Sequence, residues 1–269
     1  MEKEIKLTSP TLGERVLSML SVDVFRLFRS KLFYIVIATA LLVPLVMTVM
    51  MTMMDGTVST NPQTGAQTVM VGPENVWQNI GTLPGGEAMG GMEIFAMCNI
   101  NMAFMGVDVF VCLFISDDFR SGYAKNLFAV RSKRDEYVIS KTVSGFLVGA
   151  LMLVAYFIGS VLGGAVSGLS FDLGGLGVGN LICCLLAKIF LMLVFVSIFT
   201  LISVAARQRA WLSICGSLGG GMLLFMTVSI ITPLSSGAVN VLLCLVGGVL
   251  FAVGLGFASR AILKRAHLV

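Results

Sequence analysis

Long apolar runs recur along the chain and constrain its fold more than any other feature. Six runs are each about 20 residues long, which is the length that a helix needs to cross a hydrocarbon core of roughly 30 Å. Backbone groups in lipid must be hydrogen-bonded within the chain, and the runs lack the alternation of barrel strands. We therefore predict membrane-spanning helices at 32–53, 94–116, 141–166, 178–203, 210–231 and 238–258.

The composition agrees with a polytopic all-α membrane protein. Of the 269 residues, 57% are hydrophobic and only 12% are charged, whereas charged residues make up about 25% of an ordinary soluble domain. The six cysteines all lie inside the apolar runs. We therefore expect neither a disulfide framework nor a metal site.

Lysine and arginine lie almost entirely on one side of the predicted membrane. Of the 18 basic residues, 17 lie before span 1, between spans 2 and 3, between spans 4 and 5, or after span 6. Lys141 is counted with the loop because it lies at the edge of span 3, and only Lys188 lies well inside a span. The positive-inside rule then places both chain ends in the cytoplasm. The net charge of +4 reflects this topology and contact with anionic lipid, so we expect no nucleic-acid partner.

These features divide the chain into a cytoplasmic N-terminal part (1–31), a transmembrane domain (32–258) and a cytoplasmic tail (259–269). The transmembrane domain includes a long outer loop (55–93) and a charged cytoplasmic loop (117–140). The outer loop is either a lid or receptor surface or a polar connector. Its stretch "GPENVWQNIG" predicts a short helix with Pro73 near its start and Trp77 as an anchor at the membrane interface.

Residues 10–31 are predicted to form one amphipathic helix. Its apolar positions recur at helical spacing, while its polar positions share the other side. Such a helix lies either in the inner membrane interface or beside neighbouring protein as a solvated juxtamembrane helix. The apolar positions are Leu12, Val16, Leu20, Val24, Leu27 and Phe28, and the polar ones are Glu14, Arg15, Asp23 and Arg26.

Six side chains inside the predicted spans are candidates for a transport path. Methionines at the end of span 1 offer adaptable contacts, although methionine is also an ordinary membrane filler. A charge at membrane depth is expensive, so it should face the bundle interior, a wet cavity or another charge. A structural ion pair and a proton relay are both open for the two charged residues. The candidates are Met47, Met50, Met51, Met54, Asp108 and Lys188.

Glycines four residues apart in spans 3 and 5 allow neighbouring helices to approach closely. They are compatible with packing inside one chain and with a subunit interface. The pairs are Gly145 and Gly149, Gly159 and Gly163, and Gly216 and Gly220.

The charged segment "SDDFRSGYAKNLFAVRSKRDEYVISK", residues 116–141, holds ten of the 32 charged residues. It contains an acidic residue, a glycine four positions on, a lysine soon after, an arginine in a turn and a lysine that opens span 3. This layout resembles the first cytoplasmic loop of bacterial ABC-2-type transporter permeases. The matching positions are Asp118, Gly122, Lys125, Arg134 and Lys141.

The resemblance implies a type-2 ABC exporter fold and a permease subunit in the bacterial cell membrane. Such a subunit pairs with a second permease, identical or related, and with two separate ATPase subunits that hold ATP and magnesium. The segment 117–136 would be the coupling helix that sits in a groove of the ATPase. The cargo implied is a peptide-like or hydrophobic molecule, such as an antimicrobial peptide or a drug.

The residues of this segment suit a protein interface in their own right, because aromatic anchors together with arginine are typical of interface hot spots. Basic side chains around these anchors can pair with acidic groups of a partner. The candidate coupling residues are Asp118, Phe119, Arg120, Gly122, Tyr123, Lys125, Leu127, Phe128 and Arg134.

Two other functions fit the sequence: a secondary transporter that uses Asp108 and Lys188, and a non-transporting membrane scaffold or receptor. The chain has no Walker A, HExxH or GxSxG motif, and its single histidine is His267. We therefore expect no enzyme activity and no cofactor in this chain itself.

Overall fold

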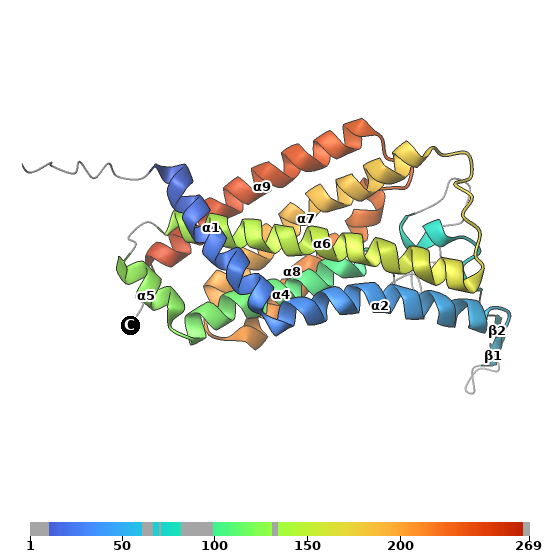
Figure 1. Cartoon of the computed structure of the whole chain (residues 1–269), viewed down its shortest axis with the longest axis horizontal. Coiled ribbons are helices and arrows are strands. Elements are labelled where there is room, and N and C mark those ends of the chain that lie inside the picture. The colour runs from blue at the N-terminus through green and yellow to red at the C-terminus, as the bar shows by residue number, and fades with distance from the viewer. Residues whose placement is uncertain (1–10, 61–66, 70, 82–98, 131–133, 266–269) are drawn as a thin grey trace, which may run out of the picture.

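The computed structural model describes residues 11–60, 67–69, 71–81, 99–130 and 134–265. Long helices lie side by side along one axis, and a short hairpin lies at one end (Figure 1). The elements are α1 (Leu12–Arg29), α2 (Lys31–Met54), β1 (Val58–Thr60), β2 (Gln67–Val69), η1 (Val76–Asn79), α4 (Met102–Arg120), α5 (Tyr123–Val130), α6 (Asp135–Ser167), α7 (Val178–Ala206), α8 (Ala210–Ile231) and α9 (Ala238–Arg265).

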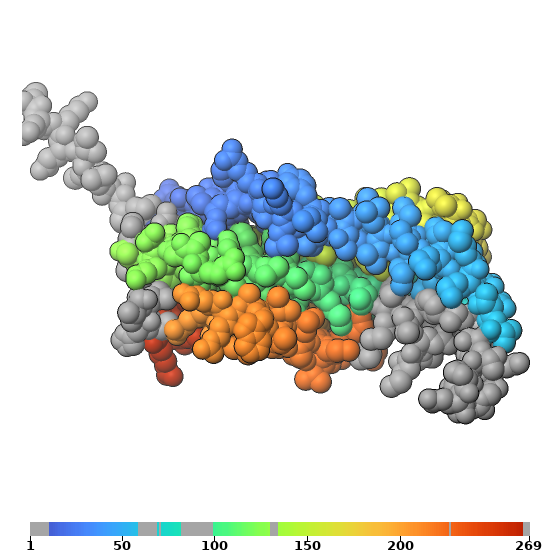
Figure 2. Space-filling view, turned by 90° about the horizontal axis from the view of Figure 1, so that it is seen from below, coloured from blue at the N-terminus to red at the C-terminus, as the bar shows by residue number. Residues whose placement is uncertain are grey.

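Helix α7 is the centre of the bundle and packs against α4, α6, α8 and α9, while α2 packs along the other side of α6. Figure 2 shows the N-terminal helices on one side of the molecule and the orange α7–α8 region on the opposite side, with the green region between them. The core is apolar and aromatic, and Phe104, Phe195 and Phe199 lie in it. The expected all-helical architecture is confirmed in the described residues, apart from the β1–β2 hairpin.

Four helices are long and apolar enough to cross a membrane: α2, α6, α7 and α9. This supports a membrane-embedded protein. Helix α4 carries Asp108 near its middle and three charged residues in its last turn, and the apolar part of α8, residues 210–225, is shorter. The described part of the chain therefore establishes four candidate spans rather than the six expected. Residues 94–98 of the predicted second span lie outside the described residues, and α4 begins at Met102.

Residues 71–81 lie at the end of the bundle that carries the hairpin. The predicted short helix is η1, three residues after Pro73. Trp77 is buried within the protein instead of lying at an exposed interface, because its ring stacks on Phe157 and its indole N–H donates to the carbonyl oxygen of Phe171 at 2.9 Å. Asn79 donates to the hydroxyl of Thr48 on α2 at 2.9 Å.

The predicted glycine pairs serve packing inside one chain. A Cβ on Gly159 would meet the backbone carbonyl oxygen of Leu41, and one on Gly163 would lie 3.0 Å from the Cα of Leu45. Helices α2 and α6 therefore approach so closely that no larger side chain fits between them. The other pairs also face neighbouring helices: Gly145 and Gly149 face α7 and α4, and Gly216 and Gly220 face Ile202 and Ile198 of α7.

We predict that Gly159→Ala destabilises the protein, although alanine is the better helix former by about 1 kcal/mol. The added methyl group must push against the α2 backbone, which costs about 1–3 kcal/mol. Gly254→Ala on α9 is the matched control, because nothing lies within 4 Å of its Cβ position. Melting curves of the purified variants in detergent measure both effects, and equal melting temperatures would contradict close α2–α6 packing.

Candidate functional site: a buried ionic cluster under the charged loop

Helix α1 presents its charged side to the bundle. It begins with a capping box, in which the hydroxyl of Thr11 accepts from the backbone N–H of Glu14, and it ends before Ser30. Its buried residues are Met19, Asp23 and Leu27. The amphipathic helix expected at 10–31 therefore forms over 12–29. The polar side that an interfacial helix would turn to water packs instead against α6 and reaches α4.

Two carboxylates and two cations meet where α1, α4 and α6 converge. Lys141 of α6 lies 2.7 Å from Asp23 of α1 and 2.7 Å from Asp118 of α4. Arg26 of α1 lies 2.8 Å from the other oxygen of Asp118. We call Asp23, Arg26, Asp118 and Lys141 the ionic cluster. It joins helices that are far apart in the sequence.

The ionic cluster is neutral in sum and is buried. Asp23, Asp118 and Lys141 are almost fully shielded from solvent, and the side chain of Arg26 is about one-quarter exposed. The hydroxyls of Ser140 and Tyr137 donate to Asp23 at 2.6 Å and to Asp118 at 3.1 Å. A buried charge is tolerated only when it is paired and hydrogen-bonded, and each carboxylate here has both kinds of partner.

Aromatic rings cover the cations of the cluster. The guanidinium of Arg26 lies 4.2 Å from the ring centre of Tyr123, and the ammonium of Lys141 lies 4.0 Å from that of Phe114. Such cation–π contacts are strongest where water is excluded. Burial, together with the nearby carboxylate of Asp23, raises the pKa of Tyr123. Burial alone would lower the pKa of Arg26, but Asp118 and Asp23 outweigh it and raise the value.

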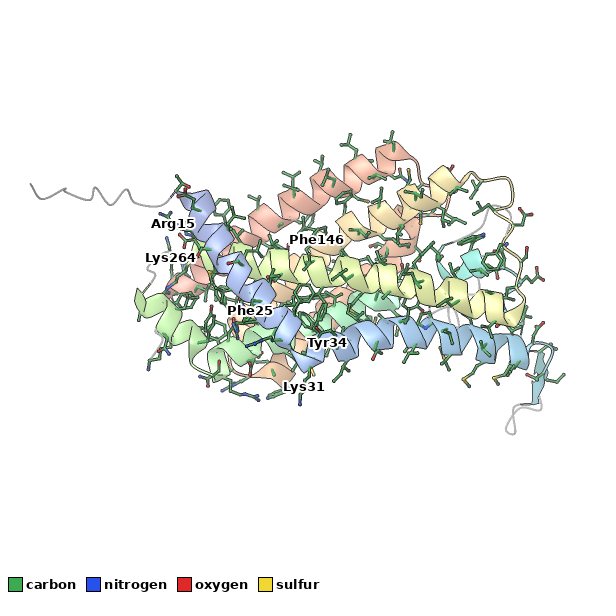
Figure 3. The ribbon with its side chains drawn as sticks, viewed as in Figure 1. Arg15, Phe25, Lys31, Tyr34, Phe146 and Lys264 are labelled. Atoms are coloured by element: carbon green, nitrogen blue, oxygen red, sulfur yellow. The ribbon has the colours of Figure 1, made fainter. Side chains whose placement is uncertain are left out.

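Two further ion pairs secure the first turn of α6. Glu136 lies 2.6 Å from Arg15 of α1, and Asp135 lies 2.6 Å from Arg260 of α9. Acidic residues are favourable at this position because a helix N-terminus carries partial positive charge. The start of α6 is therefore tied both to the N-terminal helix and to the C-terminal one. Arg15 and Lys264 are labelled at this end of the molecule in Figure 3.

Some of the predicted coupling residues face into the protein. Asp118 is fully buried in the ionic cluster, and Phe119 is only 6% exposed and packs edge-on against Tyr137. Tyr123 lies against Arg26. In this structure the side chains of Asp118 and Phe119 are therefore not free to meet a partner, and they hold the loop to the bundle instead.

Two other predicted coupling residues lie on the outside: Arg120 at the end of α4 and Lys125 of α5 are exposed. Leu127 and Phe128 are only partly exposed and pack against the core. Gly122 has a φ of +77°, which allows the sharp turn from α4 into α5. Arg134 is half-buried, with its guanidinium 5.6 Å from the ring centre of Phe128. Arg131 and Lys133, at the tip of the charged segment, lie outside the described residues.

Sequence reasoning missed Asp23 and Arg26 as members of this site, and it treated Lys141 only as the residue that opens span 3. A usable signal existed, because Arg15, Asp23 and Arg26 share one stripe of α1. Charged side chains on the stripe that faces apolar helices need partners of opposite sign. The charged segment supplies these partners.

Asp108 and Lys188 face the bundle interior, as expected, but they do not pair with each other. The thiol of Cys112 donates to Asp108 at 3.1 Å. Lys188 donates to the side-chain oxygens of Asn101 and Thr232, each at 2.9 Å. Lys188 therefore ties α7 to the residue before α4 and to the residue after α8. The two charged candidates belong to separate polar groups.

The candidate methionines of α2 do not gather around a common cavity. Met51 is buried and Met47 is partly buried, whereas Met50 and Met54 are exposed on the surface of the helix. Within the described ranges, no group of three or more histidine, cysteine, aspartate or glutamate side chains could hold a metal ion.

We predict that Lys141→Met strongly destabilises the protein. The substitution leaves two buried carboxylates facing one guanidinium, which costs about 3–5 kcal/mol and lowers the melting temperature by roughly 10 °C. The double variant Lys141→Met, Asp23→Asn restores a balance of one carboxylate to one cation and should regain part of the loss. Lys125→Met on the exposed face of α5 is the control and should leave the melting temperature unchanged. A Lys141→Met protein as stable as wild type would show that the cluster does not hold the fold together.

Comparisons with protein-family models, with curated proteins and with solved structures gave no match for this chain. The functional assignment therefore rests on the site itself and on the resemblance of the charged segment.

Proposed function

We propose that this chain is the permease subunit of an ATP-driven exporter of the ABC-2 type, in a bacterial cell membrane. It works with a second permease subunit and with two separate ATPase subunits. In this proposal α4 and α8 cross the membrane beside α2, α6, α7 and α9, which gives six spans. Their 19 and 22 residues correspond to about 29 and 33 Å of helix, close to the thickness of a hydrocarbon core.

The distribution of basic residues supports the proposed orientation. The exposed cations of α5, the last turn of α9 and the α7–α8 turn come from the stretches that the positive-inside rule assigns to the cytoplasm. Both ends of the described chain lie toward the end of the bundle that carries α5 (Figure 1). That end would face the ATPase subunits.

One observation carries the proposal: the outer face of α5 is bound through the ionic cluster to the helices behind it. Arg120 at the end of α4 and Lys125 of α5 offer positive charge to a partner, while the partly exposed Leu127 and Phe128 pack against the core. Directly beneath, Asp118 and Lys141 connect α4 and α6 to α1. A partner that moves α5 therefore moves α4, α6 and α1 with it.

In the proposed mechanism, ATP binding closes the ATPase pair, and the outer face of α5 receives that movement. The ionic cluster keeps α1, α4, α5 and α6 in register, so the movement separates the two permease halves instead of bending the loop. The path between them, lined by α4 and α8, then opens to the outside for a peptide-like or hydrophobic cargo.

The separation of Asp108 from Lys188 bears on the alternative of a secondary transporter. Lys188 uses two donors on neutral oxygens of Asn101 and Thr232, so the two residues do not form a direct ion pair with each other. Transport that continues after ATP depletion would favour the secondary transporter over the exporter.

We predict that a double charge reversal, Arg120→Glu with Lys125→Glu, releases the ATPase. Both side chains are exposed, so the fold should be retained, while like charges set against an acidic partner cost several kcal/mol and lower binding by at least about tenfold. The measurement is the ATP hydrolysis that co-purifies with the tagged chain from its native membranes. Lys264→Glu, an exposed charge reversal on α9, is the matched control and should keep the ATPase. A wild-type chain that brings down no ATPase, or a double variant that keeps it in full, would refute the proposal.

A further inference from the structure

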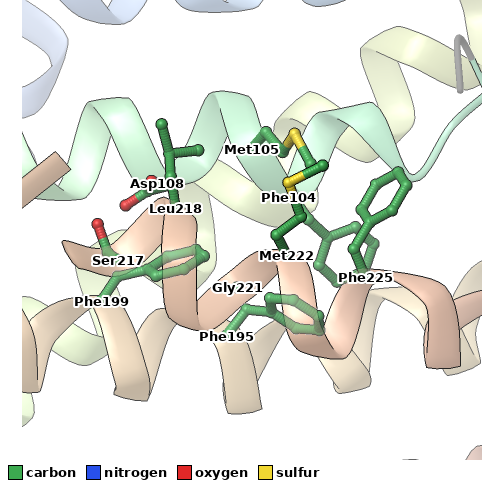
Figure 4. A pocket seen from close by; sticks show the side chains of 10 residues that line it. All are labelled: Phe104, Met105, Asp108, Phe195, Phe199, Ser217, Leu218, Gly221, Met222 and Phe225. Carbon is green, nitrogen blue, oxygen red and sulfur yellow. The ribbon is translucent and has the colours of Figure 1, made fainter. Parts of the chain in front are cut away.

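A small cavity lies between α4, α7 and α8 (Figure 4). Its volume is about 10 Å³, which is the room that a single water-sized group needs. Four phenylalanines, Phe104, Phe195, Phe199 and Phe225, are among the ten residues that line it, and the carboxylate of Asp108 is its only charged group. The cavity is therefore an apolar, aromatic compartment with one acid in it.

One oxygen of that acid has no hydrogen-bond donor. Asp108 is fully buried, and its Oδ1 accepts from the thiol of Cys112, but its Oδ2 accepts no hydrogen bond from any described residue. Ser217 lies next to the carboxylate (Figure 4); its hydroxyl donates to the carbonyl oxygen of Ser213 at 2.6 Å and lies 3.1 Å from the sulfur of Cys112.

The neighbouring hydrogen bonds form a chain in which each donor points toward the acid. The hydroxyl of Ser213 donates to Ser203 at 2.7 Å, and the hydroxyl of Ser203 donates to the sulfur of Cys112 at 3.2 Å. The thiol of Cys112 then has its own proton left for Asp108. A chain of donors that ends on a carboxylate favours negative charge there, whereas burial without a cation disfavours it. Three helices contribute to this arrangement.

A buried negative charge needs a cation, and the described residues supply none. No ion pair within the described ranges includes Asp108, and Lys188 is held by Asn101 and Thr232. In the ionic cluster, by contrast, each carboxylate has a lysine or arginine within 2.8 Å. Asp108 is therefore a buried acid with no cationic partner in the described part of the chain, and a cation from outside could supply one.

The wall of the cavity suits a cation. The face of a phenylalanine ring is negative, and it attracts an ammonium group most strongly where water is excluded. The cavity has room for one small head group, so a primary ammonium fits and a trimethylammonium does not. Its protons can also be donated to the open Oδ2 of Asp108 and to the oxygen of Ser217.

The cavity can be reached from the side of the bundle. Met105 and Leu218 on its rim are partly exposed, and Met222 is 48% exposed. These flexible side chains lie on α4 and α8, the two helices that line the path in the proposed exporter. The outer loops 55–93, 168–180 and 232–237 contain no lysine or arginine, and the first two contain acidic residues, which favours positive ligands on that side.

We propose that this cavity binds the primary ammonium group of a cationic amphiphile, such as an alkylamine or an apolar peptide with a lysine side chain. Asp108 accepts hydrogen bonds from the ammonium group, and the four phenylalanine rings surround the charge of that group. The apolar part of the ligand extends out of the cavity past Met222. The assignment of this amphiphile as cargo rests on the proposed exporter function, whereas the binding itself does not require the ATPase.

The test is the binding of n-hexylamine to the full chain in nanodiscs of zwitterionic lipid, measured by calorimetry against empty nanodiscs. Saturable binding of hexylamine is expected, with neutral 1-hexanol and bulky hexyltrimethylammonium at least about tenfold weaker, a difference that corresponds to the loss of one strong contact. Equal binding of all three probes would overturn the proposal, because the site would then distinguish neither the charge nor the size of the head group.

Three variants locate the binding site. Asp108→Asn keeps the shape of the side chain and should weaken hexylamine binding at least about tenfold. Met222→Trp fills the exposed mouth without touching the acid and should do the same, which keeps the test valid if Asp108→Asn folds poorly. Glu74→Gln, an exposed outer carboxylate, should leave binding unchanged. Unaltered binding to both Asp108→Asn and Met222→Trp, or a loss with Glu74→Gln alone, would refute the site.

Failure here is distinct from failure of the proposed function, because these measurements contain no ATPase. If hexylamine does not bind while the ATPase co-purifies as predicted, the exporter proposal stands and only the class of cargo is wrong. If hexylamine binds and no ATPase co-purifies, the site stands without the exporter.

Discussion

The protein depends on one electrostatic constraint: two carboxylates buried at the end of an apolar bundle must each have a cation. Asp23 and Asp118 cannot reach water, so Lys141 and Arg26 have to lie beside them. These four residues come from α1, α4 and α6. Satisfying the constraint therefore fixes where the N-terminal helix lies, how α4 turns into α5, and where α6 lies relative to both.

The rest of the bundle is held by contacts that lack this directionality. Helices α2 and α6 meet through glycine against backbone, and the aromatic core around α7 packs by shape. Lipid does not drive apolar helices together in the way that water does, so close packing and a few polar contacts carry the specificity. The groups around Asp108 and Lys188 are such contacts: the first joins residues of α4, α7 and α8, and the second joins α7 to the residues that flank α4 and α8.

Length and hydropathy predicted the long helices because a helix in lipid needs little besides an apolar run, and most observed bounds lie within a few residues of those expected. The ionic cluster was not predictable in the same way, because Asp23 and Lys141 are 118 positions apart and meet only when α1 folds back along α6. The burial of Asp108 and Lys188 followed from the cost of charge in lipid. Their partners did not follow, since serine, cysteine and asparagine carry no pairing pattern in a sequence.

The most direct test of the central claim is hydrogen exchange of the isosteric variant Asp118→Asn, followed by mass spectrometry in lipid. If the ionic cluster fastens the charged loop to the bundle, amide exchange should rise together in α1 and in α5, while that of α7 and α9 stays as in wild type. Exchange in α5 equal to wild type, or a uniform rise over every helix, would contradict the account.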